Sequence, residues 1–400
     1  MPGPLHGYRI IDLTNMISGP LGTMLLADQG ADVIKVEAPG GDYTRSVSTR
    51  RGGFSASFLN NNRNKRSVCI DLKRDEGHAV LLRLLAGADV MVQNFRPGVI
   101  ERMGFDEASV RAIAPTIVYV SISGFGHAGP YAHKPVYDPL VQALSGLASI
   151  QAGSDHERPR LVRTIVPDKL TGVTASQAIT AALLARERSG EGQHVRLSML
   201  DSVVTFLWGS DMGSQTFIGD ECEQAEAQSF IDLIYETTDG HISVAVQSDR
   251  QWQGLCAALE QPQWLEDERF LNSVLRHKFI NDRLELTQQV LRTNTSAHWL
   301  ERLEAADVPC VPVLRRNEMI HHPQIRDCGL LLELSHPHAG ALRQTRPAAT
   351  FSATPPERYL GAPALGEHND AVLREAGYNS DEIAHLHRQG VLRSEPPGDL

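Results

Sequence analysis

The stretch "YRIIDLTNMISGPLGTMLLADQGADVIKVE", residues 8–37, decides the fold of this chain. Two β-type runs, residues 8–13 and 32–36, flank a helix-like stretch at residues 21–28. Both runs are almost continuously apolar, as the strands of a parallel sheet covered on both faces must be. We therefore predict that the chain opens with a β-α-β unit.

The same alternation continues through the first 125 residues. Further β-type runs lie at residues 67–72, 89–93 and 117–123, and a helical pattern lies at residues 75–85. Repeated β-α-β alternation predicts a doubly wound, Rossmann-like α/β domain. Beyond residue 137 we expect helices at residues 140–150 and 176–187, whereas residues 194–207 mix strand and helix signals. A second unit begins near residue 230, where Asp239-Gly240 between two β-type runs predicts a hairpin.

Composition and charge exclude several classes of protein. The 38 basic and 48 acidic residues give a net charge of −10, so no overall basic surface recruits nucleic acid. No apolar run reaches the ~18 residues that a membrane-spanning helix needs, and the N-terminus does not resemble a signal peptide. Five scattered cysteines without a C-x-x-C pair indicate reduced thiols, so we expect a cytoplasmic protein.

The glycine loops do not favour a dinucleotide site. The first βα turn contains Gly19, Gly22 and Gly30 but lacks the G-x-G-x-x-G spacing that holds a pyrophosphate. That spacing occurs in "GFGHAG", residues 124–129, where Pro130 follows and no clear βαβ unit surrounds it. Glycines for tight turns and close packing explain both loops. An NAD-dependent dehydrogenase is therefore the weaker hypothesis.

Histidine and serine patterns also give little support to two kinds of catalytic site. The clusters at residues 321–322, 336–338 and 385–387 lack the helical H-E-x-x-H spacing, so we expect no metal site. No G-x-S-x-G elbow occurs, so a Ser-His-Asp hydrolase is poorly supported.

Basic residues concentrate locally against the acidic background. Five of them lie in "NNNRNKRSVCIDLKR", residues 60–74, around a predicted strand. One interpretation is a solvated basic face. The other is a phosphate site, because several of these residues lie near the carboxyl ends of parallel strands, where α/β sheets bind ligands. The residues concerned are Arg45, Arg50, Arg51, Arg63, Lys65, Arg66, Lys73, Arg74, Arg96 and Arg102.

Asp168 stands in "TIVPDKLTGVTASQAITAALLA", residues 164–185, where an apolar stretch gives way to a helical pattern. Aspartate is a preferred N-cap residue, and capping alone would explain it. A helix N-terminus also favours an ionised carboxylate and offers N–H groups for developing negative charge. Such a carboxylate beside a thioester could act as a nucleophile, and the residues themselves leave both interpretations open.

Six segments together resemble the class III CoA-transferases, the group that includes formyl-CoA transferase, carnitine CoA-transferases and α-methylacyl-CoA racemase. They occur in the family's order along nearly the whole chain. The segments are residues 7–45, "NRNKRSVCIDLKRDEG", "VQNFRPGVIERMGF", "SISGFGHAGPYAHKPVYDPLVQALSG", "GEGQHVRLSMLDSV" and "LGEHNDAVLREAGYNSDEIAHLHRQGVL". The resemblance implies an interlocked homodimer whose large CoA-binding domain spans residues 1–225 and 323–400. A small α+β domain, residues 226–322, would be inserted between the two parts.

The resemblance also implies a reaction in which Asp168 is the nucleophile. Asp168 would attack an acyl-CoA thioester, and CoA would pass to a small carboxylic acid through an aspartyl-CoA intermediate. Neither metal nor ATP would be needed, and acyl-CoA would be a substrate rather than a tightly bound cofactor. A CoA-binding protein without turnover is disfavoured because the matching Asp168 is present.

The family's CoA-contacting positions carry over onto Met16, Ile17, Ile70, Lys73, Asn94, Arg102 and Lys134. Lys73 and Arg102 would face phosphates, and we add Arg96 from its place just past a predicted strand. The chain departs from formyl-CoA transferase at Ile17 and Ala38, which replace glutamine and arginine. It also has no counterpart of that enzyme's glycine-rich loop between Gly219 and Tyr235.

Tyr137 favours transfer over racemisation. Racemases of the family have a histidine base in the segment represented here by "KPVYDPL", where this chain has Tyr137. Since the reference pKa of tyrosine is near ~10, it is a poor base at neutral pH but a good hydrogen-bond donor. The alternative is a 2-methylacyl-CoA racemase that uses the same scaffold for proton transfer. Asp249, near a second acidic position of racemases, is interpreted as an exposed loop residue.

Overall fold

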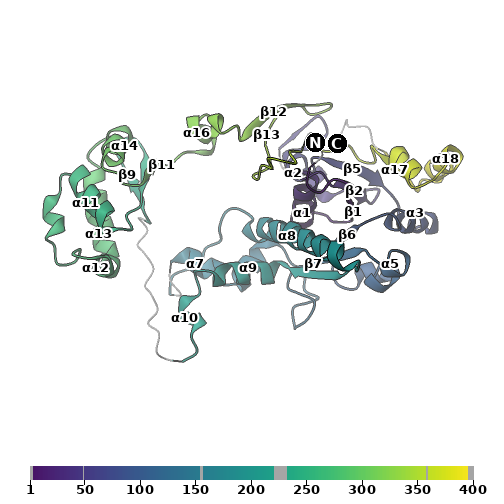
Figure 1. The fold of residues 1–400 in the computed structure, drawn as a ribbon, viewed down its shortest axis with the longest axis horizontal. Helices are drawn as coiled ribbons and strands as arrows, with labels where there is room; N and C mark the ends of the chain where they lie inside the picture. The colour runs from purple at the N-terminus through teal and green to yellow at the C-terminus, as the bar shows by residue number, and fades with distance from the viewer. Residues whose placement is uncertain (1–2, 48, 154–155, 220–231, 357–358, 395–400) are drawn as a thin grey trace. The chain divides into compact units, whose positions relative to one another are not determined.

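A computed structural model describes residues 3–47, 49–153, 156–219, 232–356 and 359–394 of the chain (Figure 1). These residues form two compact units. Unit 1 comprises Met1–Gln151, Pro159–Ile218 and Gly329–Leu400, and unit 2 comprises Ala152–Arg158 and Gly219–Cys328. The domain limits inferred above, 226 and 322, stay predictions. The segment without a glycine-rich loop, between Gly219 and Tyr235, lies largely outside the described residues.

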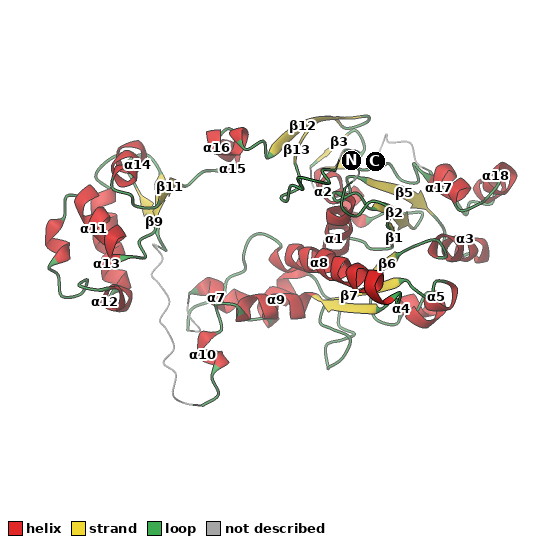
Figure 2. Cartoon of the chain, in the orientation of Figure 1, coloured by secondary structure: helices red, strands yellow, loops and turns green. Residues whose placement is uncertain are grey.

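Unit 1 is built on a six-stranded sheet in the order β5-β2-β1-β6-β7-β8, in which every neighbouring pair is parallel (Figure 2). The strands are β1 (Arg9–Asp12), β2 (Asp32–Glu37), β5 (Lys65–Cys69), β6 (Val90–Gln93), β7 (Val118–Ser123) and β8 (His194–Ser198). In chain order this is 3-2-1-4-5-6, the doubly wound arrangement. The predicted α/β fold with a parallel sheet is thereby confirmed. The order reverses between β1 and β6, where such folds bind ligands.

Both faces of the sheet are covered, which explains the continuous apolar runs. Successive strand residues point to opposite faces. Accordingly, Ile10 packs in one buried cluster with α1 (Ser18–Ala27) and α8 (Val166–Ser189), while Ile11 packs in another with α3 (Asp75–Leu85) and α5 (Glu107–Ile113). An alternating pattern with one polar face would have left one of these helix layers without a partner.

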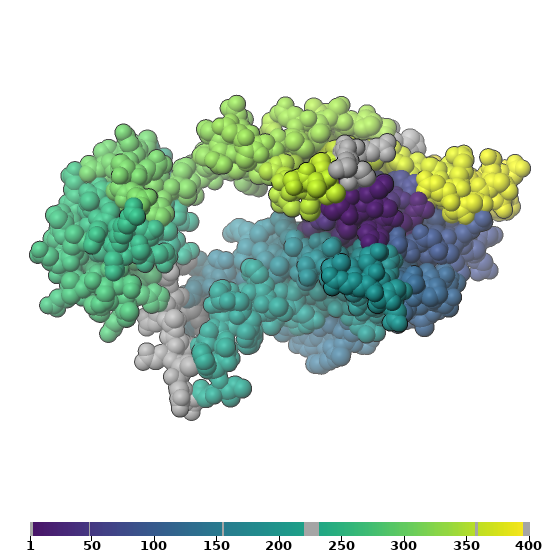
Figure 3. All heavy atoms as spheres, in the orientation of Figure 1, coloured from purple at the N-terminus to yellow at the C-terminus, as the bar shows by residue number. Residues whose placement is uncertain are grey.

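The C-terminal helices α17 (Asn369–Glu375) and α18 (Ser380–Arg388) join the α3 and α5 face. The His368 amide donates to the Ser67 carbonyl at 2.9 Å, and Ile70 forms a β-bridge with Leu392. Residues 67–70 and the C-terminal segment 368–392 therefore lie side by side in unit 1, where the yellow C-terminal part lies against blue (Figure 3).

Several predicted elements differ from the observed ones. The predicted helix at residues 140–150 is two helices, α6 (Asp138–Leu144) and α7 (Leu147–Ala152), because Gly146 between them has φ of 89°. The predicted helix at residues 176–187 begins ten residues earlier, as α8. The mixed stretch at residues 194–207 is a strand followed by α9 (Met199–Trp208). Since α8 connects β7 to β8, "GFGHAG" does stand in a β-α-β crossover, contrary to prediction.

No helix in the described residues is long and apolar enough to cross a membrane.

Smaller elements complete unit 1. The remaining elements are η1 (Tyr43–Arg45), β3 (Arg50–Arg51), β4 (Phe54–Ser55), α2 (Ala56–Asn61), α4 (Val99–Arg102), α10 (Gly213–Thr216), β12 (Leu331–His336) and β13 (Gly340–Thr345).

Unit 2 has its own antiparallel sheet, β11-β10-β9, and a core rich in tryptophan. The predicted hairpin at Asp239-Gly240 is confirmed, since it joins β9 to β10. Asp249 is not a loop residue as predicted; it begins α11 and forms an ion pair with Arg276. The elements are β9 (Ile234–Glu236), β10 (His241–Val244), α11 (Asp249–Ala258), η2 (Pro262–Leu265), α12 (Ser273–Lys278), α13 (Ile280–Leu291), α14 (Ser296–Ala305), β11 (Cys310–Pro312), α15 (Arg316–Met319) and α16 (Pro323–Asp327).

Candidate functional site

Asp168 is a residue of the first turn of α8, not its N-cap. The helix begins at Val166, and the N-cap residue, Ile165, makes no side-chain capping hydrogen bond. Pro167 is tolerated there because the first N–H groups of a helix have no partner within the helix. The capping interpretation of Asp168 is therefore wrong, because its carboxylate does not cap the N-terminus of α8.

Asp138, the first residue of α6, supplies the missing acceptor. Its carboxylate accepts the backbone N–H of Asp168 at 3.2 Å and the side-chain amide of Gln142 at 2.6 Å. The Asp138 side chain is buried. Two carboxylates thus stand at the start of α8, and we call Asp138 and Asp168 the α8 carboxylate pair. Sequence reasoning placed Tyr137 in the site but missed its neighbour Asp138.

The pKa of Asp168 is raised from its ordinary value of 3.8 to about 6. Burial of the carboxyl group is the main cause, and the negative charge of Asp138 adds to it. Hydrogen bonds from the backbone N–H and hydroxyl of Ser18, the first residue of α1, oppose the shift. The helix N-terminus therefore does not lower the pKa of Asp168, because burial and a like charge act in the other direction, but a carboxyl group with a pKa of about 6 is still mostly ionised at pH 7. Ser18 is a second site residue that sequence reasoning missed.

Two glycines bring Ser18 close to Asp168. Gly22 lies one turn after Ser18 on α1, and Gly172 lies one turn after Asp168 on α8. A Cβ atom on Gly172 would lie 2.8 Å from the Ser18 carbonyl oxygen, and one on Gly22 would lie 2.9 Å from the Gly172 carbonyl oxygen. Since both contacts are to backbone atoms, only glycine permits this separation of the helices.

The loop between β1 and α1 lies at the point where the strand order reverses. Asn94, just past β6, accepts the Asn15 N–H at 2.9 Å and donates to the Asn15 carbonyl at 2.8 Å. Met16 has φ of 69°, a left-handed conformation that costs a residue with a side chain roughly 1–2 kcal/mol. These two amide hydrogen bonds hold the loop in place beside the carboxyl ends of β1 and β6.

A group of buried charged side chains contacts the backbone of the same loop. Lys35 and Asp42 pair at 2.9 Å, Lys65 and Asp12 pair at 2.9 Å, and all four side chains are 0% exposed. We call Asp12, Lys35, Asp42 and Lys65 the β1 charge cluster. The Lys35 ammonium also donates to the Thr14 carbonyl at 2.8 Å, so the cluster fixes the backbone that leads into α1.

The pKa values in the β1 charge cluster follow from this pairing. Burial alone would raise the pKa of Asp12, but the charges of Lys65 and Lys35 hold it well below its usual range. Burial lowers the pKa of Lys65 to about 8, although the Asp12 charge opposes the shift.

The basic segment around β5 is neither a solvated face nor a phosphate site as a whole. Three of its five cations form ion pairs within unit 1: Arg63–Asp28 at 2.6 Å, Lys65–Asp12 at 2.9 Å and Arg66–Asp32 at 2.6 Å. Arg45, outside this segment, pairs with Glu37 at 2.7 Å. Among the candidate phosphate ligands, Lys73, Arg96 and Arg102 have exposed side chains.

The remaining predicted site residues fall into two environments. Ile17 is the N-cap residue of α1, and Ile70 is buried beside the C-terminal segment. Lys134 and Tyr137 lie in the exposed loop before α6; the Lys134 ammonium lies 3.3 Å from the Tyr131 ring centre, and Tyr137 is 63% exposed. The structure thus brings Met16, Ile17 and Asn94 together where the strand order reverses.

Comparisons with known proteins agree on one family. A family model described as CoA-transferase family III matches residues 5–369. The chain is 36% identical to the succinate–glutarate CoA-transferase of Agrobacterium fabrum, over 93% of this chain and 95% of the relative. It is 33% identical to the acetyl-CoA:oxalate CoA-transferase of Acetobacter aceti, over 93% of this chain and 96% of the relative. A crystal structure of a CAIB/BAIF family protein from Brucella suis matches with a TM-score of 0.81 and 29% identity, covering 94% of this chain and 100% of that one.

Proposed function

This chain belongs to CoA-transferase family III and is an acyl-CoA:carboxylate CoA-transferase, and we propose that Asp168 is its nucleophile. The observation that carries the proposal is a partly exposed carboxylate at the start of α8 whose pKa is raised to about 6. A carboxylate with a raised pKa is a stronger nucleophile than an ordinary aspartate, yet it is still mostly ionised at neutral pH.

The proposed reaction exchanges one thioester for another. An oxygen of Asp168 bonds to the thioester carbon, and the carbon–sulfur bond breaks to release CoA thiolate and leave a mixed anhydride. The thiolate then attacks the Asp168 carbonyl, which frees the donor acid and gives an aspartyl-CoA thioester. The incoming carboxylate attacks that thioester, and the same two steps in reverse yield the new acyl-CoA and free Asp168.

Ser18 and Asp138 take positioning roles in this proposal. The Ser18 N–H and hydroxyl, which act to lower the pKa of the Asp168 carboxylate, suit the oxyanion that forms when the Asp168 carbonyl is attacked. Asp138 holds the first turn of α8 through the Asp168 N–H and raises the pKa of the nucleophile by its charge. Tyr137, which follows from the resemblance and is exposed beside Asp138, is proposed to donate a hydrogen bond to bound substrate.

CoA binding is assigned to two groups of residues. The first group is Met16, Ile17 and Asn94, which lie where the strand order reverses, and this position suits the part of CoA nearest the thioester. The second group consists of exposed cations, which suit the phosphates of CoA: Lys73, Arg96, Arg102 and Lys134. Ile70, also assigned to CoA binding, is buried.

We further propose a cytoplasmic homodimer, interlocked as the family resemblance implies. Large apolar side chains stand exposed on α6 and α9, which is unusual for a monomer surface. Leu140 is 50% exposed, Phe206 57% and Trp208 48%. Light scattering of the purified protein at micromolar concentration should give twice the chain mass.

The acceptor is proposed to be a dicarboxylic acid, with succinyl-CoA as the first donor to test. The support is that two relatives of similar identity are named for succinate, glutarate or oxalate. A panel of acyl-CoA donors and mono- and dicarboxylates, followed by chromatography of the CoA esters, ranks the substrates directly.

Trapping the intermediate tests the nucleophile. With succinyl-CoA, hydroxylamine should inactivate the enzyme and convert Asp168 to a hydroxamate, and borohydride should reduce it. Asp168→Ala should lower transfer by about three orders of magnitude or more while CoA still binds.

Undiminished transfer in Asp168→Ala, or a label on another residue, would overturn the assignment. Wash-in of deuterium at the α-carbon of a 2-methylacyl-CoA, without covalent labelling, would instead support the racemase alternative.

A further inference from the structure

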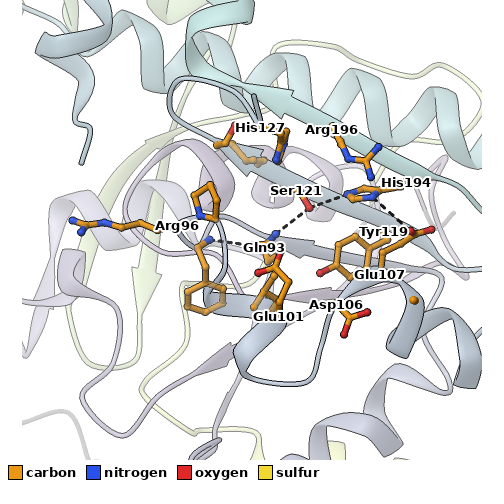
Figure 4. Close-up of a pocket in the computed structure, with 16 residues that line it drawn as sticks. Gln93, Arg96, Glu101, Asp106, Glu107, Tyr119, Ser121, His127, His194 and Arg196 are labelled. Carbon is orange, nitrogen blue, oxygen red and sulfur yellow. Dashed lines mark hydrogen bonds and ion pairs between the residues drawn. The ribbon is translucent and has the colours of Figure 1, made fainter. Parts of the chain in front are cut away.

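A cavity of about 300 Å³ is lined by residues of β6, β7 and β8, and Asp168 is not among them (Figure 4). Its polar floor comes from three neighbouring strands: Gln93 on β6, Ser121 on β7 and His194 on β8. Glu107, the first residue of α5, closes the row. Nothing in the proposed CoA-transfer reaction uses these four side chains.

The four side chains form a chain of contacts (Figure 4). Gln93 Nε2 donates to Ser121 Oγ at 3.0 Å, Ser121 Oγ lies 2.9 Å from His194 Nε2, and His194 Nδ1 lies 3.9 Å from Glu107 Oε2. The Tyr119 ring packs edge-on against the imidazole, with ring centres 4.9 Å apart, and holds its orientation.

One backbone contact fixes which atom donates and which accepts in each of these hydrogen bonds. Gln93 Oε1 accepts the Phe95 N–H at 2.8 Å, so the amide nitrogen of Gln93 must face Ser121. Ser121 Oγ then accepts from Gln93 and donates its proton to His194 Nε2. The imidazole proton therefore stands on Nδ1, which is buried, lacks a hydrogen-bond partner within the described residues and faces the Glu107 carboxylate.

Burial and the charge of Arg196 lower the pKa of His194 to about 4. The imidazole is therefore neutral at physiological pH, and its unprotonated Nε2 accepts the hydrogen bond from Ser121. A serine bonded to the unprotonated nitrogen of a histidine, with a carboxylate beyond the other nitrogen, is the geometry by which acyl-transfer sites are recognised on unrelated folds.

We propose that Ser121, His194 and Glu107 form a second acyl-transfer centre that hydrolyses small esters and thioesters. Ser121 Oγ bonds to the acyl carbon, its proton moves to His194 Nε2, and the leaving alcohol or thiol departs with that proton. Water then attacks the acyl-serine, gives a proton to Nε2 and becomes part of the product acid, while Ser121 regains its proton. The net reaction is ester plus water to acid plus alcohol or thiol.

Gln93 and the cavity walls set the limits of this activity. The Gln93 amide is placed to offer an N–H to the oxyanion, the role that side-chain amides play in other acyl-transfer sites. A volume of about 300 Å³ is at the lower end for ligand sites, so short acyl groups are the substrates expected. Phe95, Ile100 and Ile122 form the apolar part of the lining, and charged side chains such as Arg96, Glu101 and Arg196 form the rest, so the cavity suits a short acyl group that carries a polar end.

The test uses the full-length enzyme, p-nitrophenyl acetate and a fluorophosphonate probe. We expect release of p-nitrophenolate and a covalent adduct on Ser121, located by peptide mass spectrometry. His194→Gln should slow both at least a hundredfold, and Ser121→Ala should abolish them while CoA transfer continues. Asp168→Asn is the matched control, because it removes CoA transfer and leaves the Ser121 adduct.

An adduct only on other residues, or labelling of Ser121 at an undiminished rate in His194→Gln, would overturn the proposal and leave the chain of contacts a purely structural one. If Ser121→Ala fails to fold, the comparison of His194→Gln with the unaltered enzyme still decides, since both retain Ser121.

Discussion

The pKa of a carboxylate is shifted in opposite directions in the β1 charge cluster and in the α8 carboxylate pair. Asp12 is fully buried against Lys65, and its pKa is held well below its usual range. Asp168 is partly buried beside Asp138, and its pKa is raised to about 6. Within the described residues no ion pair includes either member of the α8 carboxylate pair.

The difference shows where the chain uses charge for structure and where it holds a reactive group. Paired charges in the β1 charge cluster fix the loop that carries Met16 into α1. The α8 carboxylate pair accepts hydrogen bonds but has no positively charged partner in the described part of the chain, so the pKa of Asp168 stays above the ordinary value for aspartate. The β1 charge cluster therefore stabilises the fold. The α8 carboxylate pair destabilises it, but it raises the reactivity of Asp168.

Breaking the β1 charge cluster should have the largest effect. Lys65→Met leaves Asp12 buried without its partner, and removing one member of a buried pair costs about 3–5 kcal/mol. We expect that loss in the free energy of unfolding by urea. Lys73→Met, at an exposed lysine just after the same strand, is the control and should stay within about 0.5 kcal/mol. Equal stabilities of the two variants would contradict the structural role of the cluster.

Removing the charge of Asp168 should stabilise the fold. A carboxyl group whose folded pKa lies above its ordinary value adds stability below about pH 4, and that stability is lost as the pH rises through about 6. Asp168→Asn should therefore be more stable than the unaltered protein at pH 7.5, by up to about 3 kcal/mol. The gain should vanish near pH 4, and a gain that does not depend on pH would refute the raised pKa.

Separating α1 from α8 should weaken both stability and turnover. Gly172→Ala places a methyl group against the Ser18 carbonyl, and overpacking of this kind costs about 1–3 kcal/mol. Since Ser18 moves away from Asp168, the turnover number should fall more than the Michaelis constant changes. Gly213→Ala, which has open space around it, is the matched control and should leave both quantities unchanged.

The smallest effect should appear in the pH profile of transfer. Because Asp168 must be ionised to attack, the rate should fall below about pH 6 rather than near pH 4. Asp138→Asn keeps an acceptor for the Asp168 N–H but removes the charge that raises the pKa, so the acid limb should move to lower pH. A profile that moves the other way, or does not move, would show that Asp138 acts on Asp168 by some other means.

Much of unit 1 was predictable from local sequence. Residues 8–37 show both strands and the helix between them because parallel strands buried on two faces must be apolar throughout. The site roles of Asp168 and Asn94 came only from segments that resemble the family, and they stay predictions. The limits of α8 and the break at Gly146 were missed, because the first depends on Asp138 as a distant acceptor and the second on a single positive φ.

The sequence by itself determined the order of strands and helices and the presence of Asp168, since apolar periodicity and motif order are local properties of the chain. Only the tertiary structure decided which charges are paired and which are not. Lys65 meets Asp12 across 53 positions, whereas Asp168 meets Asp138 across 30. Both kinds of contact are made by the packing of elements far apart in sequence, and a pKa depends on burial and neighbouring charge rather than on residue type alone.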